Sequence, residues 1–311
     1  MKQIIKIGTR ASLLAVTQST WVKNQIEAQY PDTRVELVKI TTKGDKILDV
    51  PLAKVGGKGL FVKEIEDALL DGRVDLAVHS MKDVPTELPD GLAVAIIPPR
   101  EVAVDAFICN SAQTVTELPQ GASIGTSSLR RKAQLAALRP DLAIRDLRGN
   151  LDTRLRKLDE GMYDAIILAG AGLNRLGMGD RITSLFDPAQ MVPAIGQGAL
   201  GIELRISDHE LLEGMQFLHD QDTATAVAAE RAFLFRLEGG CQVPIGAHAL
   251  VDADSVHLTG LIASVDGKTV LREEQSAPRA EAETLGRSLA ETLLARGGKE
   301  ILDEVYQEGQ A

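Results

Sequence analysis

The chain has 311 residues, of which 44% are hydrophobic and 3% are aromatic, and its formal net charge is -10. This length exceeds the usual size of one hydrophobic core, so we expect two or three domains of about 100 residues each. The few aromatic residues and the acidic balance argue against nucleic acid as a partner, because binding along single strands uses aromatic stacking and basic grooves. Many Arg and Lys residues nevertheless lie beside Gly and Ser in predicted loops, which fits an acidic surface around a basic cleft.

The sequence gives no sign of export or of membrane insertion. Lys2, Lys6 and Arg10 interrupt the apolar residues at the N-terminus and leave no core for a signal peptide. No window is apolar enough to span a membrane. The two cysteines, Cys109 and Cys241, are too few for a disulfide framework. We therefore expect a cytoplasmic protein with reduced thiols and no membrane partner.

Apolar runs typical of strands alternate with amphipathic runs typical of helices from the N-terminus onward. The first unit has a strand at residues 4–8, a helix from its predicted cap Ser12 to about Tyr30, and a strand at 35–41. The pattern continues with a helix at 60–70 and strands at 76–80, 106–109, 123–126 and 165–169. It predicts an α/β protein with parallel or mixed sheets, whose ligands bind at the carboxyl ends of strands.

Two segments, residues 98–101 and 191–204, interrupt this pattern and indicate two lobes joined by paired crossings. After residue 220 the chain has a helix that leads to Cys241, and a smaller α+β domain follows. We expect its strands at 247–251, 257–263 and 269–273 and a final helix at 280–296. The predicted domains are domain 1 (1–98 with 199–217), domain 2 (103–193) and domain 3 (221–311).

Lys82 and Asp83 follow a predicted buried strand in the segment HSMKDVP. The carboxylate can transfer protons or stabilise a developing cation, and the ammonium group can bind an anionic group of a substrate. A solvated turn with one Lys and one Asp is an equally good interpretation of this spacing.

Arginines gather where other predicted strands meet helices. In GTSSLRRKAQ, Ser127 or Ser128 can cap a helix whose first turn carries Arg130 and Arg131. Cations are disfavoured at a helix N-terminus unless an anion compensates them, which favours a bound carboxylate or phosphate. The same theme recurs in further residues, namely Arg148 and Arg154 in DLRGNLDTRLRK and Arg10 with the predicted cap Ser12 in GTRAS. These basic strand ends favour a ligand with several carboxylates.

The glycine-rich segments have simpler interpretations than nucleotide binding. In KVGGKG, Gly59 stands where a phosphate-binding loop needs Ser or Thr, so Lys54 and Lys58 are better explained as part of a flexible lid. The histidines have no metal-ligand spacing, and no metal is expected. We expect His79 to be a hydrogen-bonded structural residue and Cys109 to be buried and inert.

Cys241 lies in the run LEGGCQVPIG, after two glycines and shortly before Pro244. The glycines leave room beside the sulfur and the proline stiffens the exit, which suits a thiol presented for covalent attachment. The alternative is a small apolar side chain tucked under a turn.

The motifs KVGGKG, HSMKDVP, TSSLRR, LRGN, AIGQG and ERAFLFRLEGGCQVPIG, together with Arg10, occur in one order along the chain. In this order the sequence resembles the porphobilinogen deaminase (hydroxymethylbilane synthase) family over nearly its whole length. The resemblance implies two lobes like those of type II periplasmic binding proteins and a third domain that carries a cofactor cysteine. It also implies a transferase that joins four porphobilinogen molecules into hydroxymethylbilane for haem biosynthesis, with release of ammonia. The primer would be a dipyrromethane bound to Cys241 by a thioether.

The resemblance also assigns expected roles to residues and to domains. Domain 1 would be the catalytic lobe, domain 2 would bind carboxylates of cofactor and substrate, and domain 3 would attach the cofactor. Asp83 would be the catalytic carboxylate, assisting loss of ammonia and stabilising the azafulvene cation. The remaining assignments are cofactor contacts from Lys82, Asp83, Thr126, Ser128, Arg130, Arg131, Arg148 and Gly172; substrate contacts from Arg10, Ser12, Arg148, Arg154 and Arg175; lid residues Lys54 and Lys58; and Gln197 in the second crossing. A monomer is expected.

Two alternatives from other classes stay open at this point. A noncatalytic carboxylate-binding protein of the periplasmic-binding type would share the two lobes and the basic strand ends. It would not need a presented cysteine in a third domain, and it would usually carry an export signal. A thiol enzyme that transfers acyl groups would need a base near Cys241, for which only His248 is close in sequence.

Overall fold

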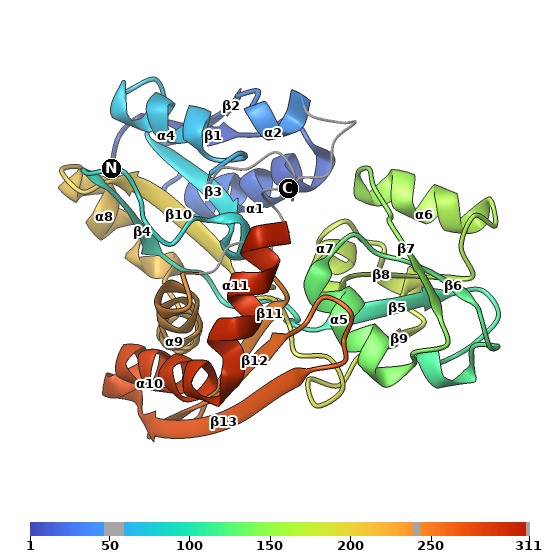
Figure 1. Cartoon of the computed structure of the whole chain (residues 1–311). Coiled ribbons are helices and arrows are strands. Elements are labelled where there is room, and N and C mark those ends of the chain that lie inside the picture. The colour runs from blue at the N-terminus through green and yellow to red at the C-terminus, as the bar shows by residue number, and fades with distance from the viewer. Residues whose placement is uncertain (47–58, 239–242, 309–311) are drawn as a thin grey trace. The chain divides into compact units, whose positions relative to one another are not determined.

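The computed structural model describes residues 1–46, 59–238 and 243–308. These residues form two compact units, Met1–Glu101 with Ala199–Ala224, and Val102–Gly198 with Thr225–Ala311. The first unit contains one five-stranded sheet, and the second contains another five-stranded sheet and a three-stranded sheet (Figure 1). The α/β class with mixed sheets and a smaller C-terminal α+β part is therefore confirmed.

The sheet of the first unit has the strand order β2-β1-β3-β10-β4. Strands β1, β2 and β3 run parallel, whereas β10 is antiparallel to both of its neighbours, β3 and β4. Helices α1 and α8 pack on one face of this sheet and α4 packs on the other. The elements of this unit are β1 (Ile4–Thr9), α1 (Leu13–Gln29), β2 (Arg34–Lys39), α2 (Lys43–Lys46), α4 (Lys63–Leu70), β3 (Leu76–Ser80), η1 (Met81–Asp83), β4 (Leu92–Ile96), β10 (Leu200–Arg205), α8 (His209–Gly214) and η4 (Gln216–Leu218).

The five-stranded sheet of the second unit repeats this arrangement, with the order β7-β6-β8-β5-β9. Strands β6, β7 and β8 are parallel, and β5 is antiparallel to its neighbours β8 and β9. In each sheet the antiparallel fourth strand lies at a crossing of the chain. The elements of this region are β5 (Asp105–Cys109), η2 (Val115–Glu117), β6 (Ser123–Gly125), α5 (Leu129–Leu138), β7 (Ala143–Arg145), α6 (Leu151–Asp159), β8 (Ala165–Ala169), α7 (Gly170–Arg175), η3 (Gly179–Arg181) and β9 (Ser184–Leu185).

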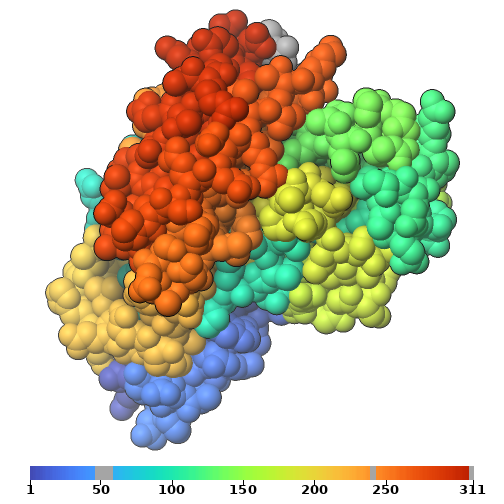
Figure 2. Space-filling model, turned by 90° about the horizontal axis from the view of Figure 1, so that it is seen from below, coloured from blue at the N-terminus to red at the C-terminus, as the bar shows by residue number. Residues whose placement is uncertain are grey.

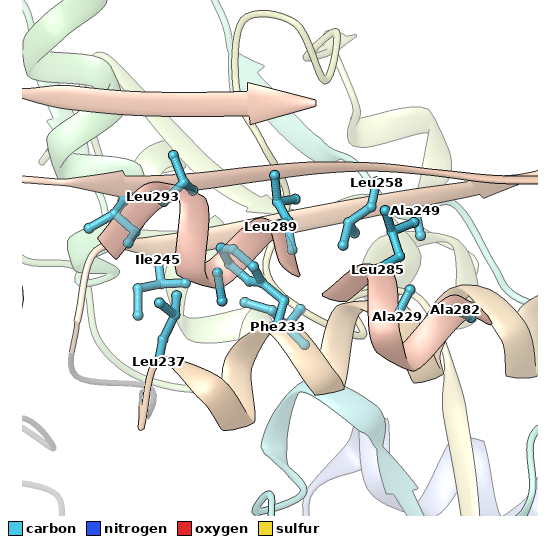
Figure 3. Close-up of a cluster of buried hydrophobic side chains, with 14 of the residues drawn as sticks. Ala229, Phe233, Leu237, Ile245, Ala249, Leu258, Ala282, Leu285, Leu289 and Leu293 are labelled. Carbon is cyan, nitrogen blue, oxygen red and sulfur yellow. The ribbon is translucent and has the colours of Figure 1, made fainter. Parts of the chain in front are cut away.

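The C-terminal part is an antiparallel sheet, β11-β12-β13, covered by helices. Its core includes Phe233 from α9, Leu258 from β12 and Leu289 from α10, each at most 1% exposed (Figure 3). Burial of such side chains stabilises a fold by about 1.5–3 kcal/mol each. The elements here are α9 (Gln221–Arg236), β11 (Ile245–Val251), β12 (Ser255–Ala263), β13 (Val270–Pro278), η5 (Arg279–Glu281), α10 (Ala282–Leu293), η6 (Leu294–Gly298) and α11 (Lys299–Glu308).

Within the second unit the C-terminal sheet contacts the segment that precedes the second crossing. Ala247 N donates to Pro193 O at 3.1 Å, and Arg272 donates to the carbonyl of Ala189. Figure 2 shows the surface near residue 190, in yellow, beside the orange surface of the C-terminal strands. A side chain at Gly246 would press on the carbonyls of Val192 and Pro193, so this contact requires glycine.

Several predicted boundaries differ from the structure. The sequence interpretation named no strand at β4, β7, β9 or β10, and β10 lies in the segment that it described only as the second crossing. The final helix, predicted at residues 280–296, occurs as α10, a π-helical turn and α11, which reaches residue 308. Gly297 has a φ of 102°, which is not helical, and the chain therefore kinks there between the two helices.

Candidate active site

The carboxyl end of β3 positions Lys82 and Asp83, as the sequence predicts. Both residues lie in the single turn η1, where Asp83 is exposed and Lys82 is partly buried. Met81 N, in the same turn, donates to Ala199 O at 3.0 Å, and Gln18 Nε2 donates to the Oγ atom of Ser80 at 3.0 Å. The turn therefore starts from a strand end that is fixed by α1 and by the segment before β10.

Arg10 and Ser12 lie at the end of β1 in the same unit. Ser12 is the N-cap of α1 and accepts from Ala15 N at 3.4 Å, which confirms the predicted cap. Arg10 donates from Nε and Nη2 to Asp45 Oδ1, at 3.0 and 2.5 Å, and its guanidinium carbon lies 4.2 Å from the ring centroid of Phe61. Burial opposes ionisation of Asp45, but the hydrogen bonds from Arg10 and Thr42 outweigh it and lower the pKa of that carboxyl.

In the second unit, Arg130 and Arg131 converge on one buried carboxylate, Asp105. Arg130 Nη1 donates to Asp105 Oδ2 at 2.7 Å, and Arg131 Nη2 donates to Asp105 Oδ1 at 2.6 Å. Arg130 Nη1 also donates to Val192 O at 2.7 Å, and Arg131 Nη1 donates to Ile167 O at 3.0 Å. The chain itself therefore supplies one anion for the two cations at the start of α5.

Burial and charge act in opposite directions on this cluster. Asp105 is 0% exposed, and burial alone would raise its pKa. The charges and hydrogen bonds of Arg130 and Arg131 outweigh burial and hold the pKa of Asp105 well below its ordinary value. The pKa of Arg130 is lowered, first by burial and then by the charge of Arg131, although Asp105 opposes this change.

Arg154, on α6, adds a third cation to the cluster. Its Nε donates to Gly149 O at 2.8 Å, and no carboxylate among the described residues forms an ion pair with it. Burial and then the charge of Arg131 lower its pKa to about 10. Gly149 has a φ of 112°, and a Cβ atom there would lie 2.7 Å from Thr153, so the turn before α6 requires glycine.

The hydroxyl groups predicted near these arginines lie at the same helix start. Ser128 is the N-cap of α5 and accepts from Arg131 N at 3.5 Å, which selects Ser128 over Ser127 as the cap. Thr126 is 2% exposed, and its Oγ1 atom accepts from Ser128 N at 3.3 Å. The neighbouring Ser127 donates instead to Leu147 O at 2.9 Å.

The remaining predicted residues of the second unit lie on its loops and on α7. Arg175, in the last turn of α7, donates to Gly198 O at 2.7 Å, and Gly172 is buried in that helix. Gln197 is 1% exposed, and its Nε2 atom donates to Ala103 O at 2.7 Å and to Asp105 Oδ1 at 3.0 Å. These hydrogen bonds connect Gln197, which precedes β10, to the segment that leads into β5. Arg148 is partly buried beside Gly149.

Three predicted site residues, Cys241, Lys54 and Lys58, lie outside the described residues. Cys109 is described: it is 8% exposed and its thiol donates to Asp164 O at 3.2 Å, as expected for a buried and inert thiol. Among the described residues, no three His, Cys, Asp or Glu side chains are grouped in a way that could hold a metal ion. The described helices include none with the length and apolar character needed to cross a membrane.

The arginine cluster fits an anionic ligand with several carboxylates. Arg130, Arg131 and Arg154 bring three guanidinium groups to the cluster, and Asp105 neutralises one of them. Buried cations are stable only when anions compensate them, so the cluster favours negatively charged groups from a ligand. A dipyrromethane, whose two rings each carry an acetate and a propionate, has this chemistry.

Comparison with known proteins agrees with this chemistry. Residues 5–213 match the family model described as "Porphobilinogen deaminase, dipyromethane cofactor binding domain", and residues 224–295 match "Porphobilinogen deaminase, C-terminal domain". The chain belongs to the porphobilinogen deaminase family. The predictions of a transferase of this family, acting in tetrapyrrole synthesis with a dipyrromethane cofactor, are confirmed. The two lobes with mixed sheets that the resemblance implies are confirmed as well.

Relatives named porphobilinogen deaminase match the chain along almost its entire length. The protein of Trichlorobacter lovleyi is 60% identical over 97% of both chains. That of Geobacter sulfurreducens is 59% identical over 97% of this chain and 95% of its own. Among solved structures, the periplasmic aliphatic sulphonate binding protein of Escherichia coli covers 76% of this chain and 71% of its own, with 16% identity and a TM-score of 0.39.

The interpretation of the sequence missed Asp105, the residue that organises the arginine cluster. Its signal in the sequence is an acid at the start of the apolar run AFIC. An acid that enters a buried strand needs cationic partners, and Arg130 and Arg131 lie 25 and 26 residues further along the chain. The contact of Gln197 with Asp105 was also not predicted.

Proposed function

We propose that Asp83 is the catalytic carboxylate with which this porphobilinogen deaminase family member joins four porphobilinogen molecules into hydroxymethylbilane. We also propose that the arginine cluster around Asp105 binds the carboxylates of the pyrrole rings. The observation that carries this proposal is that, among the residues the structure describes, guanidinium groups outnumber carboxylates in the cluster and Arg154 donates only to a backbone carbonyl, that of Gly149. When bound, the dipyrromethane supplies the pyrrole chain to which the first substrate is added.

Asp83 is suited to handle protons and positive charge on the substrate. Its carboxyl is exposed at the end of a buried strand, where it can protonate a leaving amine or accept a proton from a pyrrole ring. As ammonia leaves porphobilinogen, positive charge develops on the ring that remains, and a carboxylate beside it stabilises that charge. Lys82, one residue earlier, would bind an acetate or propionate group.

The residues of the second unit would act in binding. Arg131 and Arg154 keep N–H donors that are not used by Asp105 or by backbone carbonyls, and these can bind carboxylates. The start of α5 adds the dipole of a helix N-terminus and the hydroxyls of Thr126 and Ser128. Arg130, Arg148 and Gly172 are also proposed to contact the cofactor, and Arg148 and Arg175 to contact the substrate. In the first unit, Arg10 and Ser12 are proposed to contact the substrate.

Covalent attachment of the dipyrromethane is proposed for Cys241, through a thioether that is retained during turnover. The support is the resemblance of the segment LEGGCQVPIG to the cofactor segment of the family, together with the family model for the cofactor-binding domain. On the same ground Lys54 and Lys58 are proposed as lid residues.

We further propose three domains: residues 1–98 with 199–217, residues 103–193, and residues 221–311. Each of these ranges contains one sheet and hydrophobic clusters of its own, which supports the division. A monomer acting on the small molecule porphobilinogen is proposed from the family resemblance. A cytoplasmic location is proposed from the two cysteines, and the absence of a nucleic acid partner from the acidic composition.

Intact-mass spectrometry of the purified protein tests the attachment directly. We expect a covalent excess equal to two substrate-derived pyrrole units, located on the peptide that contains Cys241. The Cys241→Ser variant should lack this mass because a hydroxyl is a much weaker nucleophile than a thiolate. Cys109→Ser is the matched control and should keep it, since that thiol is buried in β5. The same adduct on Cys241→Ser would contradict the assignment.

A further inference from the structure

A second buried cluster of ionisable side chains lies in the first unit, on the face of the sheet that α4 covers. It consists of Glu66 on α4, His79 on β3 and Glu203 on β10, which are 6%, 6% and 1% exposed. In the antiparallel pair β3 and β10, Glu203 lies opposite Ala77, and Ala77 packs in the hydrophobic cluster under α4. Alternation along each strand directs His79 and Glu203 to this same face.

The hydrogen bonds of the cluster are incomplete. His79 Nε2 and Glu203 Oε2 are 2.8 Å apart. The Oε1 atoms of Glu203 and of Glu66 are buried and have no hydrogen-bond partner among the described residues. A buried acceptor without a donor is costly, and a protonated carboxyl supplies one donor. Burial, followed by the charge of Glu203, raises the pKa of Glu66 to about 7.

The other charged groups around α4 do not cancel the effect that raises the pKa of Glu66. The charge of Asp67 raises the pKa of Glu66 further, whereas His79 and Lys63 lower it, and none of them outweighs burial. Strand β4 has no ionisable side chain. On β1 and β10 the charged groups besides Glu203 are Lys6, which is exposed, and Arg205, which donates to the carbonyls of Leu69 and Val74. Strand β2, whose Val38 packs in the cluster under α4, carries Glu36, which pairs with Arg34 at 3.3 Å. On the side of α2, Lys43 N donates to Glu64 Oε1 at 3.1 Å.

The cluster also fixes the strand that leads to Asp83. The last two residues of β3 are held on opposite faces of the sheet, His79 by Glu203 and Ser80 by Gln18. Met81, which follows, is held by its backbone hydrogen bond to Ala199. A shift of His79 relative to β10 would therefore move the start of the turn that carries Asp83.

We propose that Glu66, His79 and Glu203 form a buried cluster that holds a proton at neutral pH and positions the turn of Lys82 and Asp83. A protonated Glu66 adds no negative charge to the cluster and supplies a hydrogen-bond donor where buried carboxylate oxygens lack one. Loss of the proton from Glu66 places a second carboxylate charge beside Glu203 and weakens the packing of α4 on the sheet. The positioning role rests on the proposed role of Asp83, whereas the titration of the cluster does not.

The sign of the pH effect follows from linkage. The folded-state pKa of Glu66 is raised above the ordinary value near 4.5, so its protonated form stabilises the fold at low pH. This contribution is lost as the pH rises from about 4.5 through about 7. Between these limits we expect the unfolding equilibrium constant of the native sequence to increase on the order of 100-fold relative to that of Glu66→Gln, whose amide is neutral at every pH.

The first test compares urea unfolding of the native sequence, Glu66→Gln and Asp67→Asn from pH 5 to 8. Asp67 is the matched control because it is the next residue of α4 and is exposed. We expect the native sequence to lose stability relative to Glu66→Gln up to about pH 7 and then to remain parallel to it. Asp67→Asn removes only a lesser cause of the raised pKa of Glu66 and should keep most of the pH dependence of the native sequence. Equal pH dependence of all three proteins would overturn the proton-holding role.

The second test measures kcat and KM for porphobilinogen. Glu203→Gln, which removes the charge paired with His79, should lower kcat about 10- to 100-fold with a smaller change in KM, because misplacement of a catalytic group affects the reacting geometry. Unchanged kcat in folded Glu203→Gln would overturn the positioning role. If that variant does not fold, the pH dependence of kcat in Glu66→Gln tests the positioning role instead. We expect the change of kcat between pH 6 and 8 to differ between Glu66→Gln and the native sequence. An identical pH profile of kcat in the two proteins would refute the positioning role. Full activity of Asp83→Asn would refute the proposed function alone, because the unfolding experiment does not depend on Asp83.

Discussion

The substitution Asp105→Asn tests whether the arginine cluster depends on one internal carboxylate. Asp105 accepts hydrogen bonds from Arg130, Arg131 and Gln197, and it is completely buried. Asparagine keeps the shape of the side chain but removes its charge and replaces one acceptor oxygen by an N–H₂ group that faces guanidinium donors. Breaking a buried ion pair in this way typically costs about 3–5 kcal/mol, a large part of the stability of a domain.

Urea unfolding at pH 7 measures this loss, with Asp159→Asn as the control. Asp159 forms a surface ion pair with Arg181 at 2.6 Å, and its removal should cost less than about 1 kcal/mol. Because the folded-state pKa of Asp105 is lowered, its contribution is present above the ordinary pKa of aspartate and is lost as the pH falls toward the folded-state value. The difference between the native sequence and Asp105→Asn should therefore shrink in acid. A loss at pH 7 no larger than that of Asp159→Asn would refute the argument.

Three further substitutions test separate parts of the molecule. Asp83→Asn should keep the circular dichroism spectrum of the native protein, and its kcat should fall on the order of 100-fold. Asp90→Asn, at an exposed aspartate, is the control and should keep the native activity. Near-native turnover by Asp83→Asn would exclude a catalytic role for Asp83. Arg154→Met should raise KM about 10-fold or more with little loss of stability, because Arg154 forms no ion pair with a carboxylate in the described part of the chain; a KM change equal to that of Arg156→Met, on the exposed face of the same helix, counts against carboxylate binding. Phe233→Ala should lower the free energy of unfolding by about 3–5 kcal/mol. The side chain of Phe235 is 49% exposed, and Phe235→Ala should lower the free energy of unfolding by less than about 0.5 kcal/mol. Equal losses would show that the cluster in Figure 3 does not determine stability.

The sequence predicts those elements whose signal is contained in their own residues. Strands β3, β5 and β8 are short continuous apolar runs, and α1 begins at a serine that caps it. Strands β7 and β9 have three and two residues, and they are strands only because β6 and β5 pair with them. Pairing of this kind depends on the tertiary structure and leaves little trace in so few residues.

The same limit applies to the candidate site. The sequence indicates that Arg130 and Arg131 lie at the start of a helix and that an anion must compensate them. It does not indicate that β5 adds beside β8 and brings Asp105 to them, because strand order is determined by the topology of the whole sheet. His79 was expected to be a hydrogen-bonded structural residue, and its contact with Glu203 confirms this. No feature of the sequence around Glu66 indicates that its carboxyl is buried.

The two five-stranded sheets share more than their strand order. In each sheet the fourth strand is antiparallel and lies at a crossing of the chain, and in each it carries a buried carboxylate, Glu203 on β10 and Asp105 on β5. Each carboxylate binds basic side chains of its own unit, His79 in the first and the arginines of α5 in the second. An apolar residue at either position would leave those buried basic groups without an anion. We infer that the crossing strands do more than connect the lobes: each supplies the internal anion that holds basic groups close to the carboxyl ends of the parallel strands, where the proposed catalytic and binding residues lie.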